Sequence, residues 1–91
     1  MLKPTFTKPF KKQYKLMKKR GMQIFKLQEI IDMIINEQPL PPECRNHPLH
    51  GEWKGSYDCH IQCDWVLIYE IDKKANKVTF HRTGTHSDLD I

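Results

Sequence analysis

Acidic side chains are missing from the first 28 residues, which contain nine lysines and arginines. The chain has a formal net charge of +4, so this segment contributes +9 and the remainder −5. An exposed helix that only keeps a protein soluble normally mixes acids with bases. A segment of one charge sign instead attracts polyanions, which is typical of nucleic-acid binding. We expect the binding cations to be Lys8, Lys11, Lys12, Lys15, Lys18, Lys19 and Lys54.

Long apolar runs are missing as well. No stretch approaches the roughly 20 apolar residues that span a bilayer, and the N-terminal sequence lacks the apolar core of a secretory signal. We therefore expect a cytoplasmic protein with no membrane partner. The three cysteines have no regular spacing, which favours free thiols over a disulfide scaffold. The length of 91 residues predicts one domain, over residues 1–91.

Two helices are predicted in the first half of the chain. Residues 2–7 suit an edge strand at best, because prolines bound them. From Pro9 apolar residues recur at helical spacing until Gly21, which is typical of a helix end. Residues 22–36 predict a second helix with a broad apolar face, and the proline-rich residues 39–48 predict a loop.

Three strands are predicted in the second half, at residues 56–61, 65–71 and 78–83. Residues 65–71 have apolar side chains on both faces, which indicates a central strand. Ser87 could cap a final turn through Ile91. The fold class is therefore α+β, with a two-helix hairpin packed on a small antiparallel sheet in the order β-α-α-β-β-β, followed by a short C-terminal helical turn.

Histidines, with an aspartate and an arginine, gather in the second half of a sequence that has no glycine-rich phosphate loop and no acidic cluster for magnesium. Cleavage of RNA without a metal needs a base for the ribose 2′-hydroxyl, an acid for the departing 5′-oxygen, and a cation for the phosphorane. Histidine pairs supply the base and the acid, and arginine stabilises the charge. The candidate residues are His47, His60, Asp64, Arg82 and His86.

Zinc binding is the main alternative use of these residues. A structural site could be formed by Cys44, His47, Cys59 and Cys63. We expect no metal, because the second pair would lie in a strand and its turn rather than in a knuckle loop. Cys59 acting as a nucleophile with His60 is weaker still, since adjacent strand residues point to opposite faces.

Two other histidines and both tryptophans carry less information. Nothing beyond composition suggests a functional role for His50 or His81, and both are expected to be surface groups. Trp65 is expected in the core, because aromatic residues in strands usually bury their area. Trp53 lies between glycines and is the better candidate for exposure.

Three linked motifs, HPLHGEWKG, CHIQCDWVLIY and RTGTHSDL, resemble the signature of YafQ-type toxins of the RelE superfamily. The resemblance implies a ribosome-dependent endoribonuclease that needs no metal and cuts messenger RNA. It also implies a tightly bound antitoxin, with operator DNA bound only through that antitoxin. The five candidate residues match family active-site positions, with His47 as the leading base, His86 as the acid, Arg82 as the phosphate clamp, and His60 and Asp64 in supporting roles.

The sequence departs from the family pattern at two positions. Asp90 stands where the family tends to have phenylalanine, so base stacking would be lost and activity or codon preference altered. Cys63 stands where relatives often have proline in the turn, a change expected to affect only turn stiffness. A non-catalytic RNA-binding module, or a DNA-binding module that depends on an antitoxin, remains the alternative function, because it needs only the basic helix.

Overall fold

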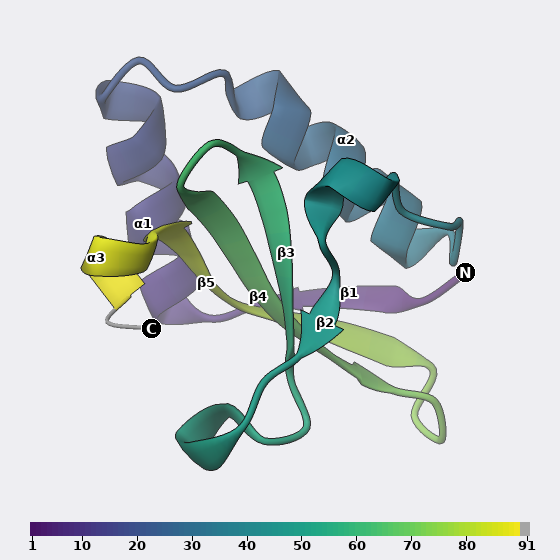
Figure 1. Ribbon diagram of the computed structural model, residues 1–91. Helices are drawn as coiled ribbons and strands as arrows, with labels where there is room; N and C mark the ends of the chain where they lie inside the picture. The colour runs from purple at the N-terminus through teal and green to yellow at the C-terminus, as the bar shows by residue number, and fades with distance from the viewer. Residues whose placement is uncertain (90–91) are drawn as a thin grey trace.

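The computed structural model describes residues 1–89 and shows two helices on one side of a five-stranded sheet (Figure 1). The α+β class predicted from the sequence is confirmed. The predicted final turn is present, but it begins at His86 and is capped by Thr85 rather than by Ser87. Its predicted last residues, Asp90 and Ile91, lie outside the described part. The elements in chain order are β1 (Lys3–Phe6), α1 (Lys8–Lys19), α2 (Ile24–Ile35), η1 (Pro42–Cys44), β2 (His47–Pro48), η2 (Gly51–Trp53), β3 (Tyr57–Gln62), β4 (Trp65–Asp72), β5 (Lys77–Thr85) and α3 (His86–Leu89).

Helix α1 begins and ends where its sequence signals predict. The Thr7 side chain caps it by accepting the Phe10 backbone N–H at 3.1 Å, and a proline occupies the first turn, where its missing N–H is not needed. Gly21, with a φ of +82°, lies just beyond its end. Helix α2 has no side-chain cap and is held instead by its buried apolar face.

The sheet has the strand order β1-β5-β4-β3-β2. Strands β3, β4 and β5 are antiparallel neighbours, as predicted. Strand β1 pairs in parallel with β5, so the sheet is mixed rather than wholly antiparallel. Strand β2 pairs with β3 inside the segment predicted to be a loop; its two residues, one of them Pro48, are too few to show a strand period.

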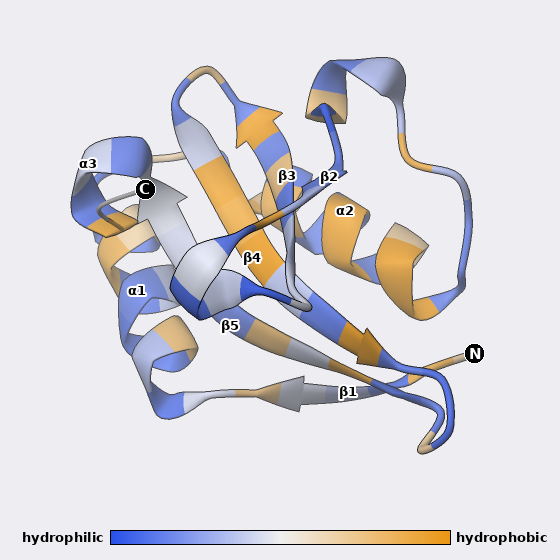
Figure 2. Ribbon diagram, turned by 60° about the horizontal axis from the view of Figure 1, so that its bottom comes forward, coloured by the Kyte–Doolittle hydropathy of each residue, from blue (hydrophilic) through white to orange (hydrophobic). Residues whose placement is uncertain are grey.

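The two faces of the central strand β4 have different environments. Trp65, Leu67 and Tyr69 point toward α1 and α2 and belong to the main apolar core, as predicted for Trp65. Val66 and Ile68 are also fully buried but point to the opposite face. The middle of β4 is therefore hydrophobic on both sides (Figure 2). Among the described residues, no helix combines the length and apolarity needed to cross a bilayer.

Candidate active site

The face of the sheet opposite the helices carries the candidate catalytic residues. The pairing register aligns one residue from each of four strands in a single row across this face: His47, Asp58, Ile68 and Arg82. Paired residues in neighbouring strands place their side chains on the same face. The row thus brings His47 from β2 and Arg82 from β5 to either side of an apolar floor. We call this surface the open face.

A second row beside the first consists of His60, Val66 and Gly84. Gly84 has no side chain, and a Cβ there would lie 3.1 Å from the Cβ of Asp88 in α3. The glycine therefore allows α3 to sit directly on β5. His86, the first residue of α3, is thereby placed with its ring centroid 5.2 Å from that of His60.

His47 is hydrogen-bonded at one ring nitrogen and faces a carboxylate with the other. Its Nδ1 lies 2.7 Å from the Arg45 backbone carbonyl, and its Nε2 lies 3.7 Å from Oδ2 of Asp58. A carbonyl oxygen only accepts hydrogen bonds, so Nδ1 must carry the proton. In neutral His47 the Nε2 lone pair is consequently available, and a proton arriving there would face the Asp58 carboxylate.

Asp58 is a member of the site that the sequence analysis missed. It is only 3% exposed, and its Oδ1 has no hydrogen-bond partner among the described residues. An unsatisfied buried oxygen costs roughly 1–3 kcal/mol, which folding alone gives no reason to retain. The available signal was strand alternation, because Asp58 and His60 are two residues apart in β3 and share a face.

His86 is held by a carboxylate from the β3–β4 turn. Its Nδ1 and Oδ1 of Asp64 form a close hydrogen-bonded contact. The carboxylate fixes the orientation of the ring and leaves Nε2 pointing away from this contact. The structure therefore places Asp64 as the partner of His86.

Arg82 is oriented by its neighbours on the open face. Its Nη1 donates a hydrogen bond of 2.8 Å to the His81 carbonyl, and its guanidinium carbon lies 5.3 Å from the Trp53 ring centroid. Trp53 is half-buried rather than fully exposed, and its ring centroid lies 5.8 Å from that of His81. His81 in turn contacts Glu70, with 3.0 Å between Nε2 and Oε1. His81 thus belongs to the support of Arg82, whereas His50 is exposed as predicted.

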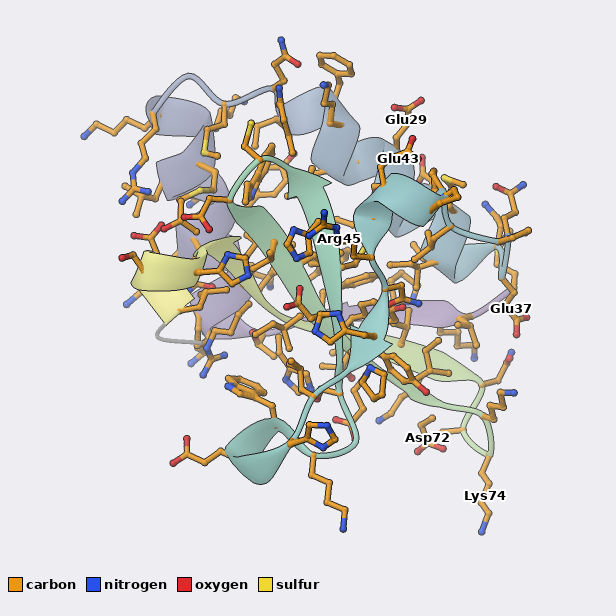
Figure 3. All side chains as sticks on the ribbon, in the orientation of Figure 1. Glu29, Glu37, Glu43, Arg45, Asp72 and Lys74 are labelled. Carbon is orange, nitrogen blue, oxygen red and sulfur yellow. The ribbon has the colours of Figure 1, made fainter. Side chains whose placement is uncertain are left out.

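Arg45 is a second cation near the histidines that the sequence analysis did not select. It projects in front of the sheet beside β3 (Figure 3). It lines a pocket together with His60 and with Glu43, Ile61, Gln62 and Cys63. The Arg45 side chain therefore lies beside His60, with the Glu43 carboxylate in the same pocket.

The four residues of the alternative zinc site do not come together. Cys44 and Cys59 are buried in the core on the helix side, where burial raises the pKa of each thiol, and Cys63 is exposed in the turn. A high pKa also argues against Cys59 as a nucleophile. Within residues 1–89, the side chains close enough to share a cation are Asp58, His60 and His86, whose ligand atoms lie within 4.8 Å of one another.

The β3–β4 turn explains one departure from the family pattern. Cys63 has a φ of +52°, in the left-handed region. Proline is fixed near −65° and cannot adopt this conformation. A proline at this position would therefore need a different turn geometry and would not simply stiffen the turn seen here.

The predicted nucleic-acid-binding lysines lie in two places. Six are on α1, on the helix side of the sheet, and three of these line a cavity with an apolar floor that includes Phe10 and Tyr14. Lys54 is exposed at the end of η2, next to Trp53. The structure thus puts Lys54 next to Trp53, the residue that contacts Arg82, and leaves the α1 lysines behind the sheet.

Known proteins are similar to this chain in sequence and in architecture. Residues 2–91 match the family described as bacterial toxin of type II toxin–antitoxin system, YafQ. The mRNA interferase toxin YafQ of Escherichia coli K12 is 42% identical over 81 residues, covering 88% of this chain and 86% of the relative.

Two solved structures extend the similarity to three dimensions. The toxin in the E. coli DinJ–YafQ complex has a TM-score of 0.90 and 37% identity, and the alignment covers 98% of both chains. A metal-bound toxin from Helicobacter pylori has a TM-score of 0.91 and 36% identity, with 98% of this chain and 99% of that chain covered. The chain therefore belongs to the YafQ family of type II toxin–antitoxin toxins.

Proposed function

We propose that this chain is a ribosome-dependent endoribonuclease that cuts messenger RNA and is neutralised by a cognate antitoxin. The observation that carries the proposal is the state of two histidines on the open face. His47 and His86 are each held at Nδ1, by the Arg45 carbonyl and by Asp64 respectively, and each presents Nε2. The name of the E. coli relative, mRNA interferase toxin, supports the same activity.

His47 is the proposed general base. With the proton fixed on Nδ1, Nε2 can take the proton of a ribose 2′-hydroxyl. The positive charge that then develops on the ring faces Oδ2 of Asp58 at 3.7 Å. Asp58 accordingly favours the protonated product of this step more than the neutral starting state, as catalysis requires.

His86 is the proposed general acid. In its imidazolium form it donates the Nε2 proton to the departing 5′-oxygen, while Asp64 holds Nδ1. The O2′–P bond forms as the P–O5′ bond breaks, leaving a 2′,3′-cyclic phosphate and a free 5′-hydroxyl. Arg82 stabilises the charge on the phosphorane, and the neighbouring His60 positions or shares a proton-transfer role.

The proposed mechanism uses no metal ion. Asp58, His60 and His86 could hold a divalent cation, because two imidazoles and a carboxylate are suitable ligands. A cation there would occupy the groups that the mechanism needs for proton transfer. We therefore expect chelators to leave cleavage intact and added zinc to inhibit it.

The partners of this activity follow from charge and from the relatives. The basic face of α1 and Lys54 would contact ribosomal or messenger RNA phosphates. The E. coli relative forms a complex with DinJ, so we propose a cognate antitoxin here, with operator DNA bound only through it. The site of action would be the bacterial cytoplasm, where ribosomes and messages are found.

Analysis of the RNA ends tests the proposed function. Purified chain is added to ribosomes programmed with a defined message, and the 5′ and 3′ ends of the fragments are identified. We expect 5′-hydroxyl and 2′,3′-cyclic phosphate ends, and no cleavage when the cut site carries a 2′-O-methyl group. Fragments with 5′-phosphates would contradict the mechanism, and ribosome binding without cleavage would favour the non-catalytic module.

A further inference from the structure

The C-terminal end of α1 and the short helix α3 are joined by a two-point ion pair. Nη1 and Nη2 of Arg20 donate to Oδ2 and Oδ1 of Asp88, at 2.8 and 3.2 Å. The two residues are 68 positions apart in the sequence. Arg20 is the C-cap residue of α1, so it is attached to a helix that packs on the core.

Asp88 also caps the helix that carries His86. Its Oδ2 accepts the Thr85 backbone N–H at 3.0 Å, and its own backbone N–H donates to Thr85 Oγ1 at 3.1 Å. This reciprocal arrangement is a capping box, which fixes the first turn of a helix. His86 lies within this turn, immediately after Thr85.

A helix of four residues cannot hold its own conformation in water. Besides the contact of His86 with Asp64, three features compensate for its length: the packing of α3 on Gly84, the capping box, and the Arg20 guanidinium. The guanidinium is the one among them that ties α3 to a separate, longer helix. It also holds the pKa of Asp88 down, at about 2, so Asp88 stays ionised as both partner and cap.

From this geometry we infer that Arg20 is a positioning residue for His86, acting through Asp88 rather than by binding RNA. The inference rests on the proposed function for its effect on cleavage, but not for its effect on the structure of α3. Arg20 differs in this respect from the α1 lysines, none of which takes part in the ion pairs among the described residues.

The effect of losing Arg20 should fall on turnover. Small misplacement of a catalytic group can cost as much as roughly a hundredfold in rate. We expect Arg20→Gln to lower kcat about tenfold or more while KM changes less than about twofold. Arg20→Lys should restore part of the loss, because lysine keeps the charge but cannot form the two-point contact.

The matched control is Lys19→Gln, which removes one positive charge from the same helix turn without touching α3. Cleavage by ribosome-bound enzyme is measured for Arg20→Gln, Arg20→Lys and Lys19→Gln, alongside Asp88→Asn and the Arg20→Gln/Asp88→Asn double variant. The double variant should be no slower than the slower single variant, because both changes break one contact.

A second readout does not depend on cleavage. NMR spectra should show the Asp88 amide and the His86 ring signals shifted in Arg20→Gln and unchanged in Lys19→Gln. If the wild type cuts no RNA but these shifts appear, the proposed function fails and the positioning role stands. Unshifted signals, or a rise in KM with kcat unchanged in Arg20→Gln, would overturn the inference and make Arg20 an ordinary RNA-binding cation.

Discussion

The two faces of the sheet are formed by the same strands but carry different kinds of side chain. On the helix face, side chains such as Leu67 and Phe80 are fully buried in apolar contacts. On the open face, the same strands present half-exposed imidazoles, an arginine, and a buried carboxylate with an unsatisfied oxygen. Consecutive residues of a strand point to opposite faces, so Cys59 lies in the core while the adjacent His60 lies on the open face.

This difference shows which groups the fold needs. Burial on the helix face lowers the free energy of the folded state, whereas the unsatisfied oxygen of Asp58 raises it. Residues that cost stability yet are held in a defined geometry are expected at functional sites. Val66 and Ile68 are fully buried and form an apolar layer beneath the polar groups of the open face, which keeps that face rigid.

Replacing Phe80 should have the largest effect on stability. Its ring stacks on Phe6 at 5.3 Å between centroids and lies near Phe10 and Tyr69 on the helix face. We expect Phe80→Ala to lower the free energy of unfolding by about 3–5 kcal/mol in urea titrations. Cleavage per folded molecule at low temperature should remain within about twofold of the wild type. A large loss of activity in fully folded protein would break the separation of the two faces.

Replacing Asp58 should affect activity and stability in opposite directions. Asp58→Asn removes the charge that faces His47 and, with it, the cost of burying a carboxylate. We expect kcat to fall at least about tenfold, while the free energy of unfolding rises by about 1 kcal/mol. Both are measured on one preparation, by cleavage assay and by urea titration. Unchanged cleavage would remove Asp58 from the mechanism.

Reversing charges on α1 should weaken binding without touching the chemistry. Changing Lys11, Lys12 and Lys15 to glutamate should weaken ribosome binding and flatten its dependence on salt. Each lost phosphate contact lowers the slope of log affinity against log salt by about 0.7–0.9. Reversal of Lys73, Lys74 and Lys77, at the β4–β5 turn, is a control with the same change in charge. If the two triple variants bind alike, the α1 lysines have no specific role.

The smallest expected effect is on the stability of the fold at low pH. The hydrogen bonds from Arg20 and, to a smaller extent, from Thr85 lower the pKa of Asp88 from 3.8 to about 2, so these contacts stabilise the fold above pH 4 and lose that contribution as the pH falls toward 2. We expect this contribution to be small, because solvent screens an exposed ion pair. Urea titrations at pH 5 and pH 2 should show a smaller loss for Asp88→Asn than for the wild type. An equal loss would mean that the pair does not contribute.

The helices and the central strands could be predicted, because the hydropathy period encodes them locally. The candidate catalytic residues could be selected by residue type, but their positions relative to one another could not be predicted. The parallel pairing of β1 and the two-residue β2 could not, since neither strand direction nor so short a strand leaves a period in the sequence. Asp58 required the register that aligns it with His47. The contact of Arg20 with Asp88 required tertiary structure, because nothing in the sequence joins residues 68 positions apart.

The most direct test of the account is His86→Gln, because glutamine keeps a polar group of similar size and removes the acid. Cleavage by ribosome-bound protein, ribosome affinity and the free energy of unfolding are measured together. We predict that the cleavage rate falls by about 10²–10⁴, while affinity is retained and the free energy of unfolding changes by no more than about 0.5 kcal/mol. Full cleavage by a folded His86→Gln protein would contradict the assignment of the open face as the catalytic site.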